Sequence, residues 1–164
     1  MELIKAKLSD IPAMQKLVKP YIDEGLVLSR SDDEIANMIR SYTIARENGE
    51  IAGFAALYIY TPKLGEIRSL AVAKARQGKG IGGAITQKLI EEAKFLELEH
   101  ILTLTYRASF FERLGFKIAP KEEVWHHKVW EDCIRCTDLA RVSGKESAPV
   151  RMIFEIKDRN ETKL

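Results

Sequence analysis

The chain has 164 residues, of which 46% are hydrophobic and 30% charged, so it suits one globular domain that buries a core without disulfides or a metal ion. A net charge of +2 argues against a dedicated nucleic-acid-binding protein, because no face is basic enough to hold a phosphate backbone, but it leaves small anionic ligands open. No apolar run approaches the roughly 18 residues of a membrane span and residues 1–10 lack a signal peptide's apolar core, so we expect a cytoplasmic protein without membrane contact.

The first part of the chain predicts one strand and two helices. Residues 3–6 favour a strand, and Ser9 has the character of an N-cap, with Pro12 tolerated in the first helical turn. The apolar stripe of that helix consists of Ile11, Met14, Leu17, Val18 and Ile22. Ser31 and Glu34 have the spacing of a capping box, which predicts a second, short helix.

A β-hairpin is expected next. Residues 42–46 and 51–60 have the composition of strands, and Asn48 with Gly49 between them is a strong two-residue turn signal. Pro62 should end the second strand, because proline has no N–H to donate to a sheet.

The stretch on which the rest of the chain depends runs from residue 66 to residue 93. An apolar run at 67–72 predicts a buried strand, four glycines follow between residues 78 and 83, and apolar residues at helical spacing then predict a helix from Ile81 to Ala93. Glycine weakens a helix, so its presence in the first turn needs a reason. Bare backbone lets a bulky anion reach the N–H groups at a helix N-terminus, where the macrodipole is positive. Strand, turn and helix are thus predicted to form a phosphate cradle.

The second half predicts further alternation of strands and helices. Residues 101–104 should form a strand parallel to the one that carries Glu66, because a helix crosses between the two. The remaining expected elements are a short helix at 110–114 ended by Gly115, a strand at 116–119, helix-like content at 124–134, a polar loop at 137–149, a last strand at 150–156 and a disordered tail at 158–164. The prediction is one α/β (α+β) domain over residues 1–157, with a mixed, mostly antiparallel central sheet and flanking helices.

The spacing of the glycines distinguishes between phosphate-binding loops. A P-loop would need GxxxxGK followed by Ser or Thr, which is absent, and the lone GxGxxG at residues 78–83 is a weak dinucleotide signal in mid-chain. Gln77, Gly80 and Gly82 match QxxGxG, and here the chain resembles the GNAT superfamily of N-acetyltransferases, in which this segment binds the pyrophosphate of acetyl-coenzyme A. The superfamily's later signature AxxFxxxxGF is matched by Ala108, Phe111, Gly115 and Phe116.

The resemblance implies a particular sheet and an acetyl-CoA site. In these enzymes the strand before the loop carries a bulge and splays from its parallel neighbour, so that backbone groups pair with the pantetheine arm. The implied contacts with acetyl-CoA are Leu70, Ala71, Val72, Gln77, Gly78, Lys79, Gly80, Ile81, Gly82, Gly83 and Phe111. No metal ion is expected as a cofactor.

Acetyl transfer to an amine needs a base for the ammonium and a proton donor for the leaving thiolate. Glu66 begins the strand whose far end should hold the cofactor, and the resemblance places the general base there. Many superfamily members have a tyrosine where this chain has Phe111, which cannot donate a proton. Tyr106, at the end of the preceding strand, is the candidate acid, with a water molecule or unassisted departure of the thiolate as alternatives.

Two arginines are candidates for binding the acceptor. Arg68 lies two residues beyond Glu66 and should project to the same face of the strand, while Arg30 precedes the second helix. Guanidinium groups suit bidentate binding of a carboxylate. The segments VLSRS, EIRSLAV, FFERLGF and KVWEDCIRC are similar to short, single-domain amino-acid N-acetyltransferases that make N-acetylglutamate in arginine biosynthesis. The resemblance therefore implies L-glutamate as acceptor and direct transfer of the acetyl group to its α-amino group.

Other interpretations stay open. Zinc could be held by His126, His127, Cys133 and Cys136, although a helix with two buried, reduced thiols is the simpler interpretation. The domain could acetylate another small amine or a peptide or protein amine, could be a toxin of the same fold, or could bind acyl-CoA as a sensor without turnover. The expected partners are an amino acid and coenzyme A, and the last strands could pair across a homodimer.

Overall fold

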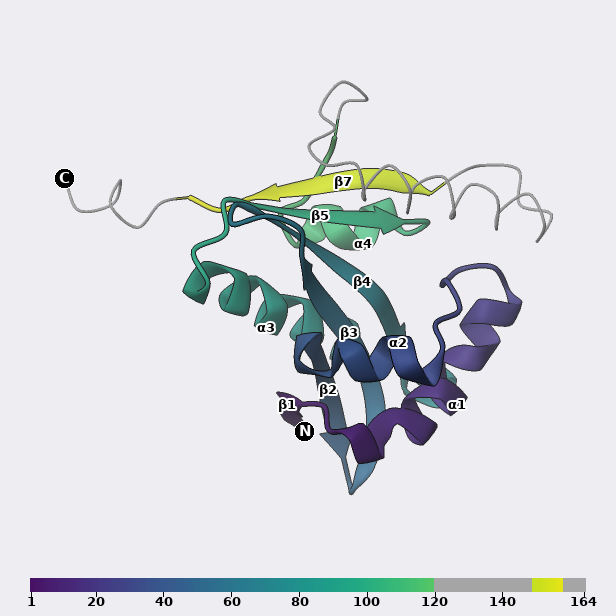
Figure 1. Cartoon of the computed structure of the whole chain (residues 1–164). Helices are drawn as coiled ribbons and strands as arrows, with labels where there is room; N and C mark the ends of the chain where they lie inside the picture. The colour runs from purple at the N-terminus through teal and green to yellow at the C-terminus, as the bar shows by residue number, and fades with distance from the viewer. Residues whose placement is uncertain (120–148, 158–164) are drawn as a thin grey trace.

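A seven-stranded sheet in the order β1-β2-β3-β4-β5-β7-β6 organises the computed structural model, which describes residues 1–119 and 149–157 (Figure 1). The strands are β1 (Glu2–Lys5), β2 (Tyr42–Glu47), β3 (Glu50–Ile59), β4 (Leu64–Val72), β5 (His100–Thr105), β6 (Lys117–Ile118) and β7 (Val150–Glu155). Neighbouring strands are antiparallel, apart from β4 and β5, which run parallel. The predicted fold class is confirmed.

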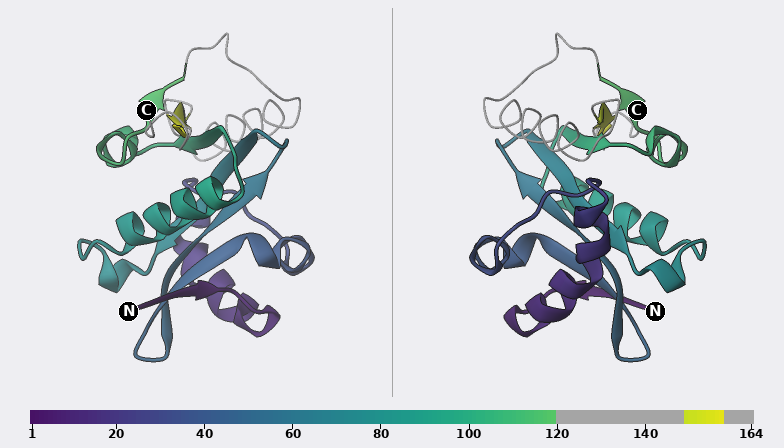
Figure 2. Two further views of the ribbon diagram at one scale, coloured as in Figure 1. Left: turned by 90° about the vertical axis from the view of Figure 1, so that its left-hand side faces the viewer. Right: turned by 90° about the vertical axis from the view of Figure 1, so that its right-hand side faces the viewer.

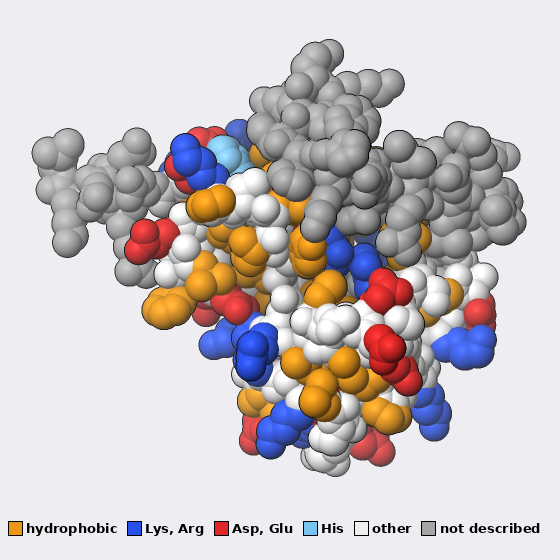
Figure 3. Space-filling view, in the orientation of Figure 1, with side chains coloured by type: hydrophobic (Ala, Val, Ile, Leu, Met, Phe, Trp, Pro, Cys, Tyr) orange, Lys and Arg blue, Asp and Glu red, His pale blue; other side chains and the backbone are white. Residues whose placement is uncertain are grey.

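Helices cover both faces of this sheet. They are α1 (Ile11–Asp23), α2 (Asp32–Asn37), α3 (Ile81–Phe95) and α4 (Ala108–Arg113), with short 3-10 turns η1 (Leu8–Asp10), η2 (Ile39–Ser41) and η3 (Lys74–Arg76). Figure 2 shows α3 on one face and α1 with α2 on the other. Each face has its own apolar core, one centred on Ile85 and Leu89 of α3 and the other on Met14 of α1. The face of the molecule in Figure 3 carries acidic, basic and apolar side chains side by side and no large patch of one charge, which agrees with the small net charge.

Two local signals in the sequence are confirmed. The Ser31 hydroxyl accepts a hydrogen bond from the Glu34 N–H at 3.1 Å, and the Glu34 carboxylate accepts one from the Ser31 N–H at 3.2 Å, which is a complete capping box. Asn48 and Gly49 both have positive φ, 51° and 77°, and join β2 to β3 in the expected hairpin.

The expected N-cap at Ser9 is wrong. Ser9 lies inside the 3-10 turn η1, and α1 begins at Ile11 with Asp10 in the cap position. The Asp10 carboxylate accepts a hydrogen bond from the Lys7 N–H at 2.8 Å, so this side chain organises the turn in place of the serine hydroxyl. The Asp10 side chain makes no capping hydrogen bond to α1 itself.

The sheet opens between β4 and β5. The two strands pair only from Leu64 opposite His100 to Glu66 opposite Leu102, and they diverge beyond that point. The Thr103 hydroxyl donates to the Ile67 carbonyl at 2.9 Å where the ladder stops. The β4 backbone beyond Ile67 therefore has one edge without a neighbouring strand.

A bulge in β4 accompanies the opening. On the β3 side, Ala71 pairs with Phe54 and Arg68 with Ala56, so two residues of β4 lie opposite the single residue between them. Ser69, in this bulge, has a φ of 60°, which is uncommon for a residue with a side chain. The bulge and the splay implied by the GNAT resemblance are both present.

The C-terminal strand was predicted, but its place in the sheet was not. β7 lies between β5 and β6 and is antiparallel to both, so β6 has no contact with β5 in the ladder. The expected helix at 124–134, all but the last residue of the loop at 137–149, and the tail at 158–164 lie outside the described residues.

Within residues 1–119 and 149–157, no helix combines the length and the apolar character needed to cross a membrane.

Candidate active site

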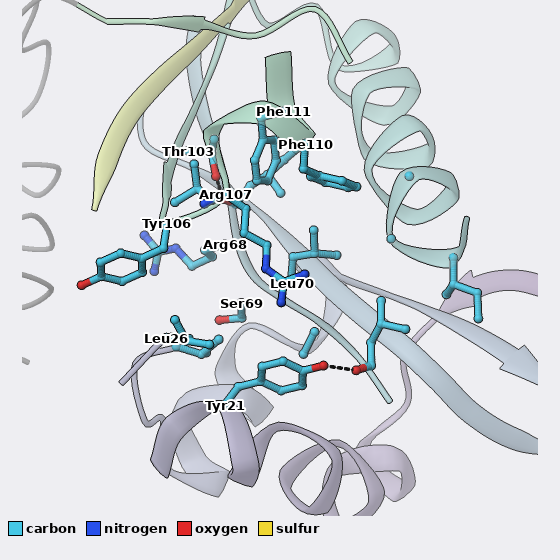
Figure 4. Close-up of a pocket in the computed structure, with 18 of the residues that line it drawn as sticks. Tyr21, Leu26, Arg68, Ser69, Leu70, Thr103, Tyr106, Arg107, Phe110 and Phe111 are labelled. Carbon is cyan, nitrogen blue, oxygen red and sulfur yellow. Dashed lines mark hydrogen bonds between the residues drawn. The ribbon is translucent and has the colours of Figure 1, made fainter. Parts of the chain in front are cut away.

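A cleft of about 490 Å³ opens where β4 and β5 diverge (Figure 4). Its walls come from the end of α1 and the loop after it, the second half of β4, the glycine loop, the first turn of α3, the end of β5 and α4. Almost all of the residues implicated by the sequence meet here. They are Arg30, Glu66, Arg68, Leu70, Ala71, Val72, Gln77, Gly78, Gly80, Ile81, Gly82, Gly83, Tyr106 and Phe111. Lys79 is exposed and does not contribute to the cleft wall.

The glycine loop fits a bulky anion. Gly78 and Gly80 have φ values of 78° and 79°, which residues with a side chain rarely adopt. A Cβ at either position would meet no atom within 4 Å, so the space above the loop is open. Gly80 caps α3, and the N–H groups of the first helical turn have no partner within the helix. The loop thus presents open backbone donors at a positive helix end, as pyrophosphate binding requires.

Glu66 and Arg68 form a buried ion pair in this cleft. The Arg68 Nε donates to Glu66 Oε1 at 2.6 Å, and the two side chains are 9% and 4% exposed. A terminal nitrogen of Arg68 also donates to the Tyr60 hydroxyl at 2.8 Å, and the guanidinium lies 3.9 Å from the centre of the Tyr58 ring. The sequence placed the two charged groups on one face, and the structure shows that much of the Arg68 guanidinium is engaged by neighbours within the protein.

Arg30 is differently placed. Its side chain is 9% exposed, and the buried Nε has no hydrogen-bond partner in the described part of the chain. The Glu34 carboxylate is 3.9 Å from a terminal nitrogen of Arg30. The Gln15 amide donates to the Arg30 carbonyl at 2.8 Å and fixes the backbone. Arg30 therefore brings a buried cation with spare donors to the cleft wall.

Tyr42 lies behind this wall, within the electrostatic reach of both arginines. Burial raises the pKa of the Tyr42 hydroxyl above its ordinary value, while Arg30, Arg68 and a hydrogen bond with Ser69 act in the opposite direction. The hydroxyl stays protonated at neutral pH and links β2 to the bulge residue of β4.

The two aromatic residues of interest differ in surroundings. Phe111 is 4% exposed and packs edge-on against Phe110 and Phe116, with ring centres 5.0 and 5.2 Å apart, so it supports the cleft wall as part of the core. Figure 4 shows the Tyr106 ring on the Arg68 side of the cleft, with its hydroxyl directed away from Phe110 and Phe111.

Several cleft residues were not singled out from the sequence. Leu26, Val27 and Leu28 add an aliphatic wall beside Arg30, Tyr21 approaches from α1, and Arg107 extends into the cleft from the beginning of α4. Arg107 follows Tyr106 directly, which is a position that could have been noticed. Val27 and Leu28 belong to the segment VLSRS, but nothing local in the sequence marks Leu26 or Tyr21.

The alternative zinc site cannot be located, because His126, His127, Cys133 and Cys136 lie outside the described residues. Within the described ranges, no three His, Cys, Asp or Glu side chains come together as a metal site would need.

Comparison with known proteins decides the family. The sequence profile of the Acetyltransferase (GNAT) family matches residues 11–116, which include the glycine loop, both arginines and Glu66. The chain belongs to the GNAT family. An uncharacterized N-acetyltransferase of Chlorobaculum tepidum is 36% identical over 148 residues, which cover 90% of this chain and 94% of that protein.

Other relatives of this GNAT chain are named amino-acid acetyltransferases. The Mycobacterium tuberculosis protein is 34% identical over 115 residues, which cover 68% of this chain and 66% of that protein. The Pasteurella multocida protein is 32% identical over 116 residues, 70% of this chain, but the match spans only 26% of that longer protein.

Solved structures confirm the GNAT fold. A Mycobacterium tuberculosis protein in complex with CoA superimposes with a TM-score of 0.79 at 28% identity, over 96% of this chain and all of that one. The N-acetylglutamate synthase of Neisseria gonorrhoeae, complexed with CoA and N-acetyl-glutamate, also gives 0.79, at 24% identity over 96% of this chain and 35% of that one, a likeness of fold alone. The chain is an acetyl-CoA-dependent N-acetyltransferase, as the sequence predicted.

Proposed function

We propose that this enzyme acetylates the α-amino group of an amino acid with a second carboxylate, L-glutamate, and so makes N-acetylglutamate for arginine biosynthesis. The observation that carries the proposal is the buried Arg30 guanidinium, which has spare donors in the cleft that also holds Glu66. A buried cation with few internal partners favours an anionic ligand, and a guanidinium binds a carboxylate with two parallel hydrogen bonds. Relatives named amino-acid acetyltransferases support this class of acceptor.

Glu66 is the proposed general base. Acetyl-CoA supplies the thioester whose carbonyl carbon the amine attacks. The Glu66 carboxylate takes a proton from the acceptor's ammonium group, directly or through a water molecule, and so frees the nitrogen lone pair. Arg68, at 2.6 Å from Glu66 Oε1, fixes the orientation of the carboxylate and compensates its charge in a buried site. Tyr106 is the proposed donor of the proton to the departing thiolate.

The two arginines then have unequal parts in binding the acceptor. Arg30 makes the main contact with a carboxylate, because its donors are less engaged. Arg68, which Glu66 and Tyr60 hold in place, adds its positive charge to the same cleft. This arrangement links the acceptor's position to that of the base.

The experiment is a thiol-release assay with acetyl-CoA and a panel of acceptors: glutamate, glutamine, leucine, a polyamine and a peptide with a free N-terminus. Glutamate should be the best acceptor, and Arg30→Ala should lower kcat/KM for it about tenfold to 150-fold, the loss of about 1.5 to 3 kcal/mol for a hydrogen bond to a charged group. The dissociation constant of acetyl-CoA should be unchanged. Lys19→Ala, on the exposed face of α1, serves as the control.

One observation favours a second candidate. Leu26, Val27 and Leu28 give the cleft an aliphatic wall next to Arg30, which would suit an apolar amino acid or a peptide N-terminus. Faster acetylation of leucine or the peptide than of glutamate, or an unimpaired Arg30→Ala variant, would replace the glutamate proposal and leave the N-acetyltransferase assignment intact.

A further inference from the structure

The open edge of β4 has one carbonyl that points into the splay at the cofactor end. The Ala73 N–H donates to the Ala52 carbonyl of β3 at 2.8 Å. The Val72 carbonyl belongs to the same planar trans peptide as that N–H, so it points in the opposite direction, away from β3 and toward the open side. This group would be available to a ligand that paired with β4 if nothing else in the protein bound it.

A tyrosine from α1 binds it. The Tyr21 side chain is 5% exposed, and its hydroxyl donates to the Val72 carbonyl (Figure 4). The same hydroxyl accepts a hydrogen bond from the Gln77 side-chain amide. Gln77 is the first residue of the QxxGxG signature, so one hydroxyl joins the end of β4 to the start of the glycine loop. Lys74 lies over the Tyr21 ring at 4.5 Å and pairs with Glu24 at 2.8 Å, which holds the same region against α1.

The other end of the open edge is closed in the same way. The Thr103 hydroxyl donates to the Ile67 carbonyl at 2.9 Å and is buried. Two hydroxyls, from β5 and from α1, thus cap the carbonyls at positions 67 and 72. The backbone between them, with the bulge at Ser69, is the part of β4 left for a ligand to pair with.

We propose that Tyr21 is a positioning residue for acetyl-CoA. Its hydroxyl holds the end of β4 and, through Gln77, the glycine loop in one arrangement, so that the strand edge and the loop amides face the same ligand before it arrives. Gln77 then acts through Tyr21 and makes no direct contact with the pyrophosphate. The bound geometry is preformed, so the ligand need not order these segments.

The test is the binding of acetyl-CoA to Tyr21→Phe, Gln77→Met and the double variant, measured by titration calorimetry on the full chain. Tyr21→Phe keeps the ring over which Lys74 lies and removes only the hydroxyl. We expect the dissociation constant to rise about threefold to tenfold in Tyr21→Phe, the range of a hydrogen bond, with a smaller rise in Gln77→Met. The double variant should bind no more weakly than Tyr21→Phe, because both changes break the same chain of contacts.

Kinetics and a matched variant separate positioning from stability. At saturating acetyl-CoA, kcat of Tyr21→Phe should equal that of the wild type, with the whole effect in KM for acetyl-CoA. Arg46→Met breaks a partly buried ion pair with Asp10 at 2.8 Å, away from the cleft wall, and should lower the melting temperature without weakening acetyl-CoA binding. Wild-type affinity in Tyr21→Phe would overturn the proposal. The proposal would also be overturned if Gln77→Met raised the dissociation constant of acetyl-CoA as much in the Tyr21→Phe variant as in the wild type. That result would mean that Gln77 binds the ligand itself.

Discussion

Removing the Arg68 guanidinium should destabilise the whole domain. In Arg68→Ala the Glu66 carboxylate, 4% exposed, loses the cation 2.6 Å away. Exposed ion pairs contribute about 0 to 1 kcal/mol to stability, whereas removing one partner of a buried pair costs about 3 to 5 kcal/mol. Because both side chains are buried here, the larger range applies. That is a large part of the roughly 5 to 15 kcal/mol that separates folded from unfolded domains.

Urea unfolding followed by circular dichroism measures this loss. With a slope of about 2 kcal/mol per molar urea, the midpoint should fall by about 1.5 to 2.5 M. The combined change Glu66→Gln with Arg68→Met removes both charges and should lose less stability than Arg68→Ala alone. Lys19→Ala breaks an ion pair whose side chains are 73% and 61% exposed and should leave the midpoint nearly unchanged.

A midpoint for Arg68→Ala within about 0.5 M of the wild type would refute the reasoning, because it would mean that water or another group compensates Glu66 at little cost. The prediction also bears on the acceptor experiment. Arg68→Ala perturbs folding and the base together, so Arg30→Ala is the cleaner probe of carboxylate binding.

Three further predictions concern the reaction itself. Gly80→Leu should abolish acetyl-CoA binding in calorimetry while the domain stays folded, because an added Cβ meets no protein atom within 4 Å and the left-handed φ of 79° costs only about 1 to 2 kcal/mol of strain; retained affinity would contradict the assignment of the loop. Glu66→Gln should lower kcat about a hundredfold or more with little change in acetyl-CoA affinity, and wild-type turnover at pH 7 would exclude it as the base. Tyr106→Phe should lower kcat and weaken the alkaline limb of its pH profile if the hydroxyl protonates the thiolate, and an unchanged profile would leave that role to water.

The sequence predicted best what short segments determine alone. The glycine loop, the hairpin at Asn48 and the capping box at Ser31 each depend on a few neighbouring residues, and each is present. One wall of the cleft could also be anticipated, since the strand, loop and helix that form it are consecutive in the chain.

What the sequence could not predict depends on contacts between distant segments. Tyr21 is one polar-tipped aromatic on a helix, and its bond to a carbonyl 51 residues away follows only from how α1 packs on the sheet. The alternation of side chains along a strand places Arg68 and Glu66 on one face, but it does not give the side-chain torsions that bring the two charged groups into contact. The wrong N-cap at Ser9 is a local failure, because the 3-10 turn η1 precedes the helix and α1 begins only at Ile11.

The position of β7 has a consequence for biosynthesis and truncation. β7 is the last described strand in the sequence, yet it is hydrogen-bonded to a strand on each side. One neighbour is β5, some 50 residues earlier in the chain, and the other is β6. Until Val150–Glu155 has left the ribosome, β5 has a bare edge next to the catalytic cleft and β6 has no partner, and such unpaired edges invite association between nascent chains. A chain cut before Val150 should therefore fail to complete the β5 side of the site and should aggregate, although residues 1–116, which span the family match, would all be present.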